Sequence, residues 1–173
     1  NHGTRTNDER LGADGDIDFV HRKVGCQDDM MVIASDNLFG FLLEGMVELY
    51  RQKKAAVIAL FDIGDNIKAS KRYGIAVLNK ENRIENFEEK PEHPKTSLVA
   101  TCCYILPKES IKKVVFYRQQ MAKHDNPGDF ISWLAQQEPV YGFIFKEHWF
   151  DIGGHDALEE ARNFYKKERG ISR

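Results

Sequence analysis

Two short apolar segments separated by an amphipathic one constrain the fold of this chain more than any other feature. Met30–Ser35 and Ala55–Phe61 are almost wholly apolar, as strands buried on both faces of a parallel sheet are. Between them, within Leu38–Lys53, apolar residues recur at three- and four-residue steps, which predicts an amphipathic helix. Strand, helix and strand in this order predict a right-handed βαβ unit whose two strands run parallel.

The remaining segments show both helical and strand periodicities. They predict a hairpin of Gly74–Leu78 and Arg83–Glu89, strands at Ser97–Leu106 and Pro139–Phe145, and helices at Ile111–Met121, Phe130–Gln137 and Ala157–Lys167. The polar stretch Asn1–Asp29 predicts a loop around a short element at Ile17–Val20. The whole pattern predicts the α/β class with a mixed sheet, and a length of 173 residues predicts a single domain, 1–173.

Charge and cysteine usage exclude several classes of partner. Lys and Arg total 25 against 27 Asp and Glu, a formal net charge of −2, so the chain lacks the basic field that nucleic acid or anionic membranes require. Its apolar segments are shorter than the ~20 residues of a membrane-spanning helix. No leader sequence opens it, and Cys26, Cys102 and Cys103 have no metal-binding spacing. We therefore expect a cytoplasmic protein with reduced thiols and no nucleic-acid or membrane partner.

Two aspartates follow apolar strands in the same way. Asp36 comes directly after Met30–Ser35, and Asp151 follows Trp149 and Phe150 ahead of a glycine turn. Because ligands of open α/β sheets bind beyond the carboxyl ends of strands, we expect both carboxylates at one edge of the sheet. Mg²⁺ needs only one or two protein carboxylates, so the pair is a candidate magnesium site. Either aspartate alone is equally an ordinary capping or turn residue, and that alternative stays open.

A lysine and a glycine flank the predicted hairpin. The segment Glu88–Pro91 ends the hairpin, and Pro91 predicts an extended conformation for Lys90, whose compact charge suits a phosphate. Gly74 begins the hairpin and would let a ligand approach the backbone closely. A solvated strand end and a simple turn are the alternatives. No serine or cysteine stands in a nucleophile-elbow pattern, which disfavours a hydrolase.

The order of these motifs along the chain resembles one family. The segments are SDNLF at 35–39, RYGIAV at 72–77, FEEKP at 87–91, Thr101 with Tyr104, and WFDIG at 149–153. In this order they resemble the sugar-1-phosphate nucleotidyltransferases, especially the glucose-1-phosphate thymidylyltransferase branch. The resemblance implies a Rossmann-like, three-layer α/β fold of the GT-A type with a mixed sheet. It also implies nucleotidyl transfer from a nucleoside triphosphate, with dTTP favoured, to a sugar 1-phosphate, with glucose 1-phosphate favoured, and release of pyrophosphate.

The resemblance further implies roles for individual residues. Asp36 and Asp151 match aspartates that bind Mg²⁺, and Lys90 matches the lysine that holds the sugar phosphate, so these three are the expected catalytic residues. The expected substrate-binding residues are Gly12, Asn37, Gly74, Glu89, Thr101 and Trp149. Glu89 matches an acid that binds sugar hydroxyls, and Gly12 resembles a glycine beside the base. Such catalysis consists chiefly of alignment and charge neutralisation, so it needs no protein nucleophile or general base.

The sequence departs from the family pattern at two places. No strand and glycine-rich loop of the GGxGTRL type precedes Asp36, and the segment His2–Arg5 resembles that loop only superficially. We therefore expect a truncated domain that is inactive alone, with a partner chain, a homo-oligomer or a rearranged sheet covering the gap. Cys102 stands where the family usually has glycine, which would narrow the sugar pocket.

Two other classes of function remain open at this point. The first is a non-catalytic sugar-nucleotide-binding or regulatory subunit with the same fold, which would need neither metal carboxylate. The second is a plain structural domain, in which Asp36 and Asp151 would not approach each other.

Overall fold

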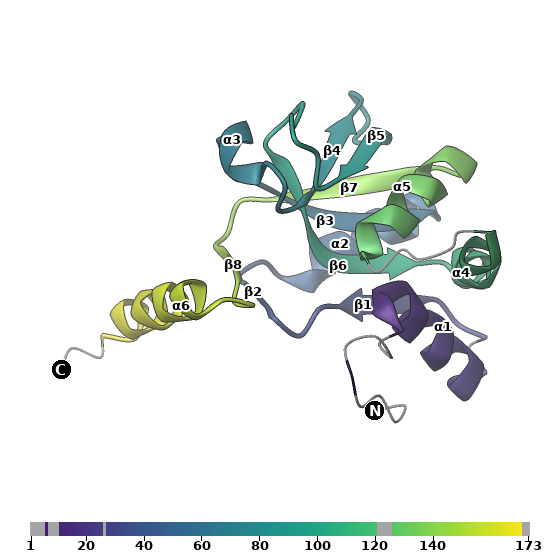
Figure 1. Cartoon of the computed structure of the whole chain (residues 1–173), viewed down its shortest axis with the longest axis horizontal. Coiled ribbons are helices and arrows are strands. Elements are labelled where there is room, and N and C mark those ends of the chain that lie inside the picture. The colour runs from purple at the N-terminus through teal and green to yellow at the C-terminus, as the bar shows by residue number, and fades with distance from the viewer. Residues whose placement is uncertain (1–5, 7–10, 26, 121–125, 171–173) are drawn as a thin grey trace.

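A computed structural model describes residue 6 and residues 11–25, 27–120 and 126–170 (Figure 1). The strands are β1 Met30–Ile33, β2 Asn37–Phe39, β3 Ala56–Asp62, β4 Gly74–Leu78, β5 Ile84–Glu89, β6 Leu98–Leu106, β7 Val140–Phe145 and β8 Trp149–Asp151. The helices are α1 Gly12–Val24, α2 Leu43–Lys53, α3 Asn66–Ala69, α4 Lys108–Gln120, α5 Pro127–Gln137 and α6 His155–Glu168. The segment 2–5 and Cys26 lie outside the described residues.

The main sheet is mixed, as the sequence predicts. Its strands run in the order β5-β4-β6-β3-β7, and β1 also pairs with β6. β3 and β7 are parallel, whereas the β1–β6, β3–β6, β4–β5 and β4–β6 pairs are antiparallel. The predicted hairpin is present as β4 and β5. A second sheet of only two strands pairs β2 with β8 in antiparallel fashion.

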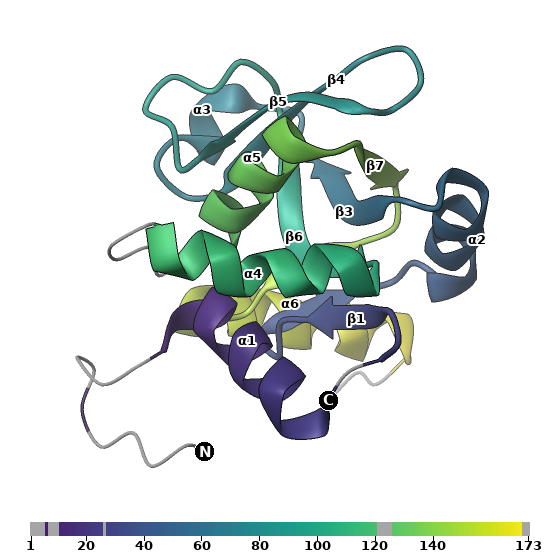
Figure 2. The same cartoon turned by 90° about the vertical axis from the view of Figure 1, so that its right-hand side faces the viewer.

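Alternate residues of β3 pack into two separate cores, one on each face of the sheet. Ile58 and Leu60 belong to a core that includes residues of α4 and α5, which cover one face (Figure 2). Val57 and Ala59 belong to a second core that includes Met46 of α2. Helices on both faces of a sheet make the three-layer arrangement that the family resemblance implies.

The βαβ unit is present, with β1 and β3 in one sheet on either side of β6, but the prediction that both strands are buried on both faces is right for β3 and wrong for β1. Residues 56–60 of β3 are buried, but β1 is half-exposed, with Met31 37% and Ile33 43% exposed. In the described part of the chain β1 pairs with β6 alone, and β6 lies between β1 and β3. Both strands are antiparallel to β6, so they run parallel to each other without touching. The position of β6 between β1 and β3 depends on pairing with a strand much later in the chain, and local periodicity does not encode such pairing. The helix that follows also begins later than predicted, at Leu43, because residues 37–39 form β2.

The short element predicted at Ile17–Val20 is part of a longer helix, α1, so the prediction of a loop is wrong for the rest of residues 12–24. Its inner face is unusually polar. Asp18 is buried and pairs with Arg118 of α4 at 2.8 Å and with Arg22 at 2.7 Å, while Arg118 also lies 3.4 Å from Asp14. Carboxylates that are neutralised by arginines take positions that apolar residues usually hold, so the helix escapes a search for apolar periodicity.

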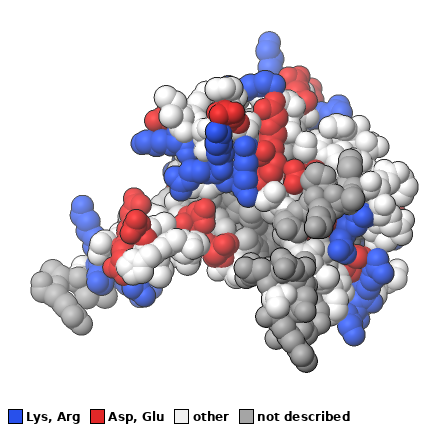
Figure 3. Space-filling view, viewed as in Figure 1, with Lys and Arg blue, Asp and Glu red and all other residues white. Residues whose placement is uncertain are grey.

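Helix α6 lies beside β8 and projects from the body of the domain (Figure 1). His148, just before β8, contacts it through Nε2, which lies 2.8 Å from the Tyr165 hydroxyl. Among the described residues no helix combines the length and apolar character that crossing a membrane requires. Lys/Arg and Asp/Glu side chains are interspersed on the face in Figure 3, in keeping with the small net charge.

Candidate active site

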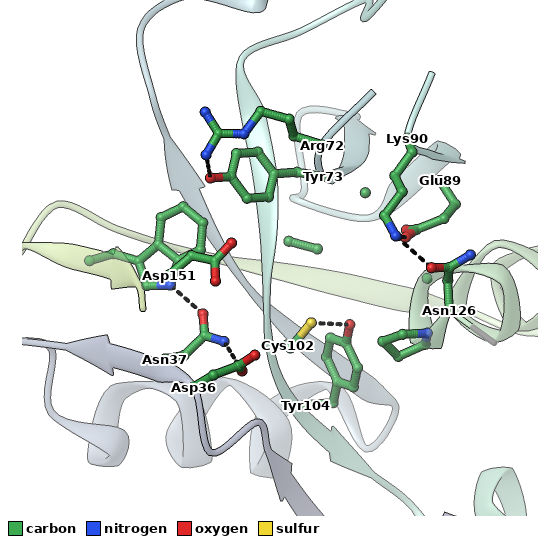
Figure 4. Close-up of a pocket in the computed structure, with 15 residues that line it drawn as sticks. Asp36, Asn37, Arg72, Tyr73, Glu89, Lys90, Cys102, Tyr104, Asn126 and Asp151 are labelled. Carbon is green, nitrogen blue, oxygen red and sulfur yellow. Dashed lines mark hydrogen bonds and ion pairs between the residues drawn. The ribbon is translucent and has the colours of Figure 1, made fainter. Parts of the chain in front are cut away.

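A cavity of about 150 Å³ lies between the β2–β8 pair and the ends of the β4–β5 hairpin (Figure 4). Residues of β6 and the first turn of α5 complete its wall. Among the residues predicted for the site, those that line the cavity are Asp36, Asn37, Gly74, Glu89, Lys90, Trp149 and Asp151. Segments far apart in the sequence therefore meet at one place.

Two residues predicted for the site do not line this cavity. Thr101 is buried, and its hydroxyl donates a hydrogen bond to the carbonyl of Ala59 at 3.2 Å, so it bonds the neighbouring strand β3. Gly12 begins α1, which packs chiefly on α4. Neither residue joins the group of polar side chains described below.

The carboxylates of Asp36 and Asp151 lie near the same residue, Gly153. Asn37 pairs with Asp151 in the β2–β8 register, and the backbone N–H of Ile152 donates to the carbonyl of Asp36 at 2.8 Å. A Cβ atom at Gly153 would lie 3.4 Å from Asp151 Oδ1 and 3.5 Å from Asp36 Oδ2. The two acids thus come together as expected, but on a small antiparallel pair of strands rather than at the end of a parallel sheet.

This pair of carboxylates fits Mg²⁺ by its chemistry. Oxygen ligands suit a hard cation, and Mg²⁺ commonly takes one or two protein carboxylates and completes its shell with water and phosphate oxygens. In the part of the chain that the structure describes, no group of three or more His, Cys, Asp or Glu side chains could hold a metal ion. The site therefore fits a cation shared with a phosphate ligand better than a closed protein cage.

Lys90 lies across the cavity from the two aspartates (Figure 4). Its Nζ donates to Asn126 Oδ1 at 2.6 Å and lies 3.8 Å from Glu89 Oε1. Its φ is +48°, so the predicted extended conformation is wrong. Backbone hydrogen bonds from Lys90 N–H to the Tyr73 carbonyl and from Lys71 N–H to the Pro91 carbonyl fix the turn, and they outweigh the local preference that Pro91 imposes.

Several residues that line the cavity were not predicted for it. They are Arg72, Tyr73, Tyr104, Asn126, Pro127 and Gly128. The Asn-Pro pair at 126–127 is a recognisable start of a helix, but nothing local tells which cavity that start faces. Cys102, which was expected to narrow the sugar pocket, does line the cavity; it has a φ of +52° and its sulfur accepts a hydrogen bond from the Tyr104 hydroxyl at 3.6 Å.

Glu89 is packed tightly between two glycines. A Cβ atom at Gly128 would lie 1.8 Å from Glu89 Oε2, and one at Gly74 would lie 2.8 Å from the same oxygen. The side chain is only 11% exposed. Burial raises the pKa of Glu89 from 4.5 to about 7, with Lys90 lowering it and Asp129 raising it further. Near neutral pH this carboxyl is therefore held close to its titration midpoint.

We expect Glu89→Gln to stabilise the fold at pH 8 and not at pH 4. Because the folded pKa lies above the unfolded one, the native state binds the proton more tightly, and stability falls as pH rises from about 4.5 to about 7. The variant escapes that loss, which should amount to about 3 kcal/mol. Urea unfolding of both proteins across this pH range measures the difference.

Glu88→Gln is the matched control for this experiment. Lys95 and Asn86 bond the Glu88 carboxylate and lower its pKa, so its contribution is already complete above pH 5. The difference between this variant and the wild type should stay constant from pH 5 to pH 8. A constant difference for Glu89→Gln as well would show that the Glu89 carboxyl does not titrate in this range.

The fold of this chain matches that of known nucleotide-sugar enzymes. It superimposes on a UDP-glucose pyrophosphorylase complexed with UDP-glucose with a TM-score of 0.78 and 22% identity, covering 92% of this chain and 64% of the other. A putative glucose-1-phosphate thymidylyltransferase from Bacillus anthracis, in complex with a sucrose, gives a TM-score of 0.75 and 24% identity over 92% and 63% of the two chains. At this identity the likeness defines the fold alone, which is the mixed α/β fold of these two proteins.

The sequence identifies the family of the chain. It belongs to the Nucleotidyl transferase family, whose model matches residues 7–168. Glucose-1-phosphate adenylyltransferase of Thermosipho africanus is 28% identical over 147 residues, which are 80% of this chain and 35% of that protein. The protein of the same name from Thermosipho melanesiensis is 27% identical over 129 residues, 73% of this chain and 31% of its own length. The chain thus spans about a third of the curated relatives that it matches.

Proposed function

We propose that this chain binds a sugar 1-phosphate in the cavity and takes part in transfer of a nucleotidyl group to it, with release of pyrophosphate. The observation that carries this proposal is the meeting of Asp36, Asp151 and Lys90 around one cavity. Two acids opposite a lysine suit a cation and a phosphate that must be brought together. Membership of the family and the names of its relatives support the reaction class.

Each charged side chain has a distinct task in this proposal. Lys90 binds the phosphate of the sugar and holds it in line for attack on the α-phosphorus of the triphosphate. Glu89, in its ionised form, accepts hydrogen bonds from sugar hydroxyls. Asp36 and Asp151 hold Mg²⁺, which neutralises phosphate charge when it is bound. The attacking phosphate oxygen is already ionised, so the chain need not supply a base.

The substrates favoured by the proposal are glucose 1-phosphate and either dTTP or ATP. Glucose 1-phosphate is named in the relatives from both comparisons. The motif order in the sequence favours dTTP, whereas the names of the Thermosipho relatives favour ATP. The preference of the chain for one nucleotide base over another therefore has to be measured.

Calorimetric titration with dTDP-glucose, ADP-glucose and UDP-glucose, each with Mg²⁺ and with EDTA, tests the proposal. We expect one of the three to bind most tightly and to lose affinity in EDTA. Pyrophosphate release with the matching triphosphate and glucose 1-phosphate then separates the alternatives. Because this chain alone is expected to be inactive, release is measured after the strand and glycine-rich loop of the family pattern are restored ahead of it. Binding without release in that longer protein identifies a non-catalytic sugar-nucleotide-binding subunit, and the absence of binding to all three contradicts the proposal.

A further inference from the structure

We propose that Trp149 and Asn37 are positioning residues that orient the Asp36 carboxylate, and that they do not themselves recognise the substrate through hydrogen bonds. The indole Nε1 of Trp149 donates to Asn37 Oδ1 at 2.7 Å, and Asn37 Nδ2 donates to Asp36 Oδ1 at 3.0 Å (Figure 4). This relay links a half-buried aromatic ring to an exposed acid. The inference rests on the proposed metal role of Asp36.

The chemistry of the three groups fixes the direction of the relay. An indole N–H can only donate, so it must meet the oxygen of the Asn37 amide. The amide nitrogen then faces Asp36, whose carboxylate can only accept. Each group therefore has one orientation that satisfies its neighbour. The single donor of Trp149 is used within the protein and is not left for a substrate.

The relay holds one oxygen of Asp36 and leaves the other for a ligand. Asn37 bonds Oδ1, while Oδ2 lies 3.5 Å from the position that a Cβ atom of Gly153 would take. Asp151 Oδ1 lies 3.4 Å from the same position and accepts a hydrogen bond from the Gly153 N–H at 3.3 Å. Without the amide bond, the exposed carboxylate of Asp36 could rotate freely about its last torsion. The hydrogen bond thus holds the Asp36 carboxylate in one orientation, with Oδ2 left for a ligand.

Packing around Trp149 makes the donor end of the relay rigid. Its ring packs edge-on against the Tyr73 ring, with the ring centroids 5.3 Å apart. Its ring centroid also lies 5.8 Å from that of Phe61 in β3. The Tyr73 hydroxyl in turn accepts a hydrogen bond from Arg72 at 2.9 Å. In the β2–β8 register Asn37 lies opposite Asp151, and Trp149 lies two residues earlier on the same face. The main sheet therefore sets the position of Asp36 through this ring.

Mn²⁺ binding, followed by electron paramagnetic resonance of the free ion, tests the proposal without any substrate. Trp149→Phe keeps the ring and removes the donor, and Asn37→Ala removes the middle of the relay. We expect each to weaken Mn²⁺ binding by about 10–100-fold, the usual effect of losing a partner of a metal ligand. Trp133→Phe and Asn66→Ala are the matched controls, since neither residue lines the cavity, and both should bind Mn²⁺ like the wild type.

A double-mutant cycle with Asp36→Asn separates orientation from general damage. If Asn37 acts only through Asp36, adding Asn37→Ala to Asp36→Asn should weaken Mn²⁺ binding no further. Wild-type Mn²⁺ affinity in both Trp149→Phe and Asn37→Ala, with weak binding in Asp36→Asn, overturns the relay and leaves the proposed function standing. Unchanged affinity in Asp36→Asn contradicts the proposed function itself. If the Trp149→Phe variant loses glucose 1-phosphate binding in EDTA, where no metal is present, the residue contacts the substrate directly and its positioning role is overturned.

Discussion

In a protein that restores the strand and glycine-rich loop ahead of this chain, replacing Asp36 or Asp151 with asparagine is expected to lower nucleotidyl transfer by about 10³-fold while leaving the fold intact. A metal ion contributes several kcal/mol of charge stabilisation in such reactions, and each aspartate supplies half of its protein ligands in our proposal. Asparagine has the same shape, so the β2–β8 pairing and the backbone bond from Ile152 to the Asp36 carbonyl should persist. Pyrophosphate release and the Mg²⁺-dependent affinity for the nucleotide sugar measure the loss.

Thermal unfolding with and without Mg²⁺ distinguishes this effect from simple damage. The two carboxylates lie near the same residue, Gly153, and like charges that lie close together repel each other when no cation is between them. Without Mg²⁺, each variant should therefore be at least as stable as the wild type. With Mg²⁺, only the wild type should gain stability, because the cation binds the native state alone. A variant that melts early under both conditions, or one that keeps the Mg²⁺ response, contradicts the assignment.

Lys90→Ala is expected to weaken binding of glucose 1-phosphate by about 10–100-fold. A hydrogen bond to a charged partner contributes about 1.5–3 kcal/mol, and the bond from Nζ to Asn126 holds the ammonium at the cavity without neutralising it. The nearby Glu89 carboxyl, 3.8 Å away, would then face the phosphate with its own negative charge unopposed. Calorimetric titration with glucose 1-phosphate in EDTA measures the contribution of Lys90 to phosphate binding separately from that of the metal.

Lys71→Ala is the matched control for Lys90→Ala. Both lysines have a positive φ, +57° and +48°, and both lie in the pair of turns that the Lys71–Pro91 backbone bond joins. Lys71 instead pairs with Glu92 at 2.6 Å, outside the cavity. We expect Lys71→Ala to bind glucose 1-phosphate like the wild type. Equal losses in both variants would show that the turn, and not the Lys90 charge, controls binding.

The sequence predicts the parts of this fold that local chemistry determines. β3 is so apolar that it can only be a central strand, and the hairpin 74–89 shows its strands and turn directly. The pairing of β6 between β1 and β3 is different, because it depends on contacts between distant segments. Helix α1 was missed for another reason, since buried carboxylates and an arginine take the place of an apolar stripe.

In the candidate site, too, some residues could be predicted from the sequence and others could not. The acids at 36 and 151 and the lysine at 90 stand in short motifs, so the sequence alone predicts them for the site, and all three line one cavity. Asn126, which bonds Lys90, sits at a helix start whose partner is 36 residues away, and no motif marks it. Thr101 stands in a motif as well, yet its side chain bonds β3 instead of lining the cavity.

A crystal structure of this chain with Mn²⁺ and the nucleotide sugar that binds most tightly tests the central claim most directly. The anomalous signal of manganese locates the ion independently of any assumption about its ligands. Our account predicts one peak within bonding distance of both Asp36 and Asp151, about 2.1 Å for Mg²⁺ itself, with the sugar phosphate on the Lys90 side. A peak on one aspartate alone, or a phosphate bound away from Lys90, would contradict it.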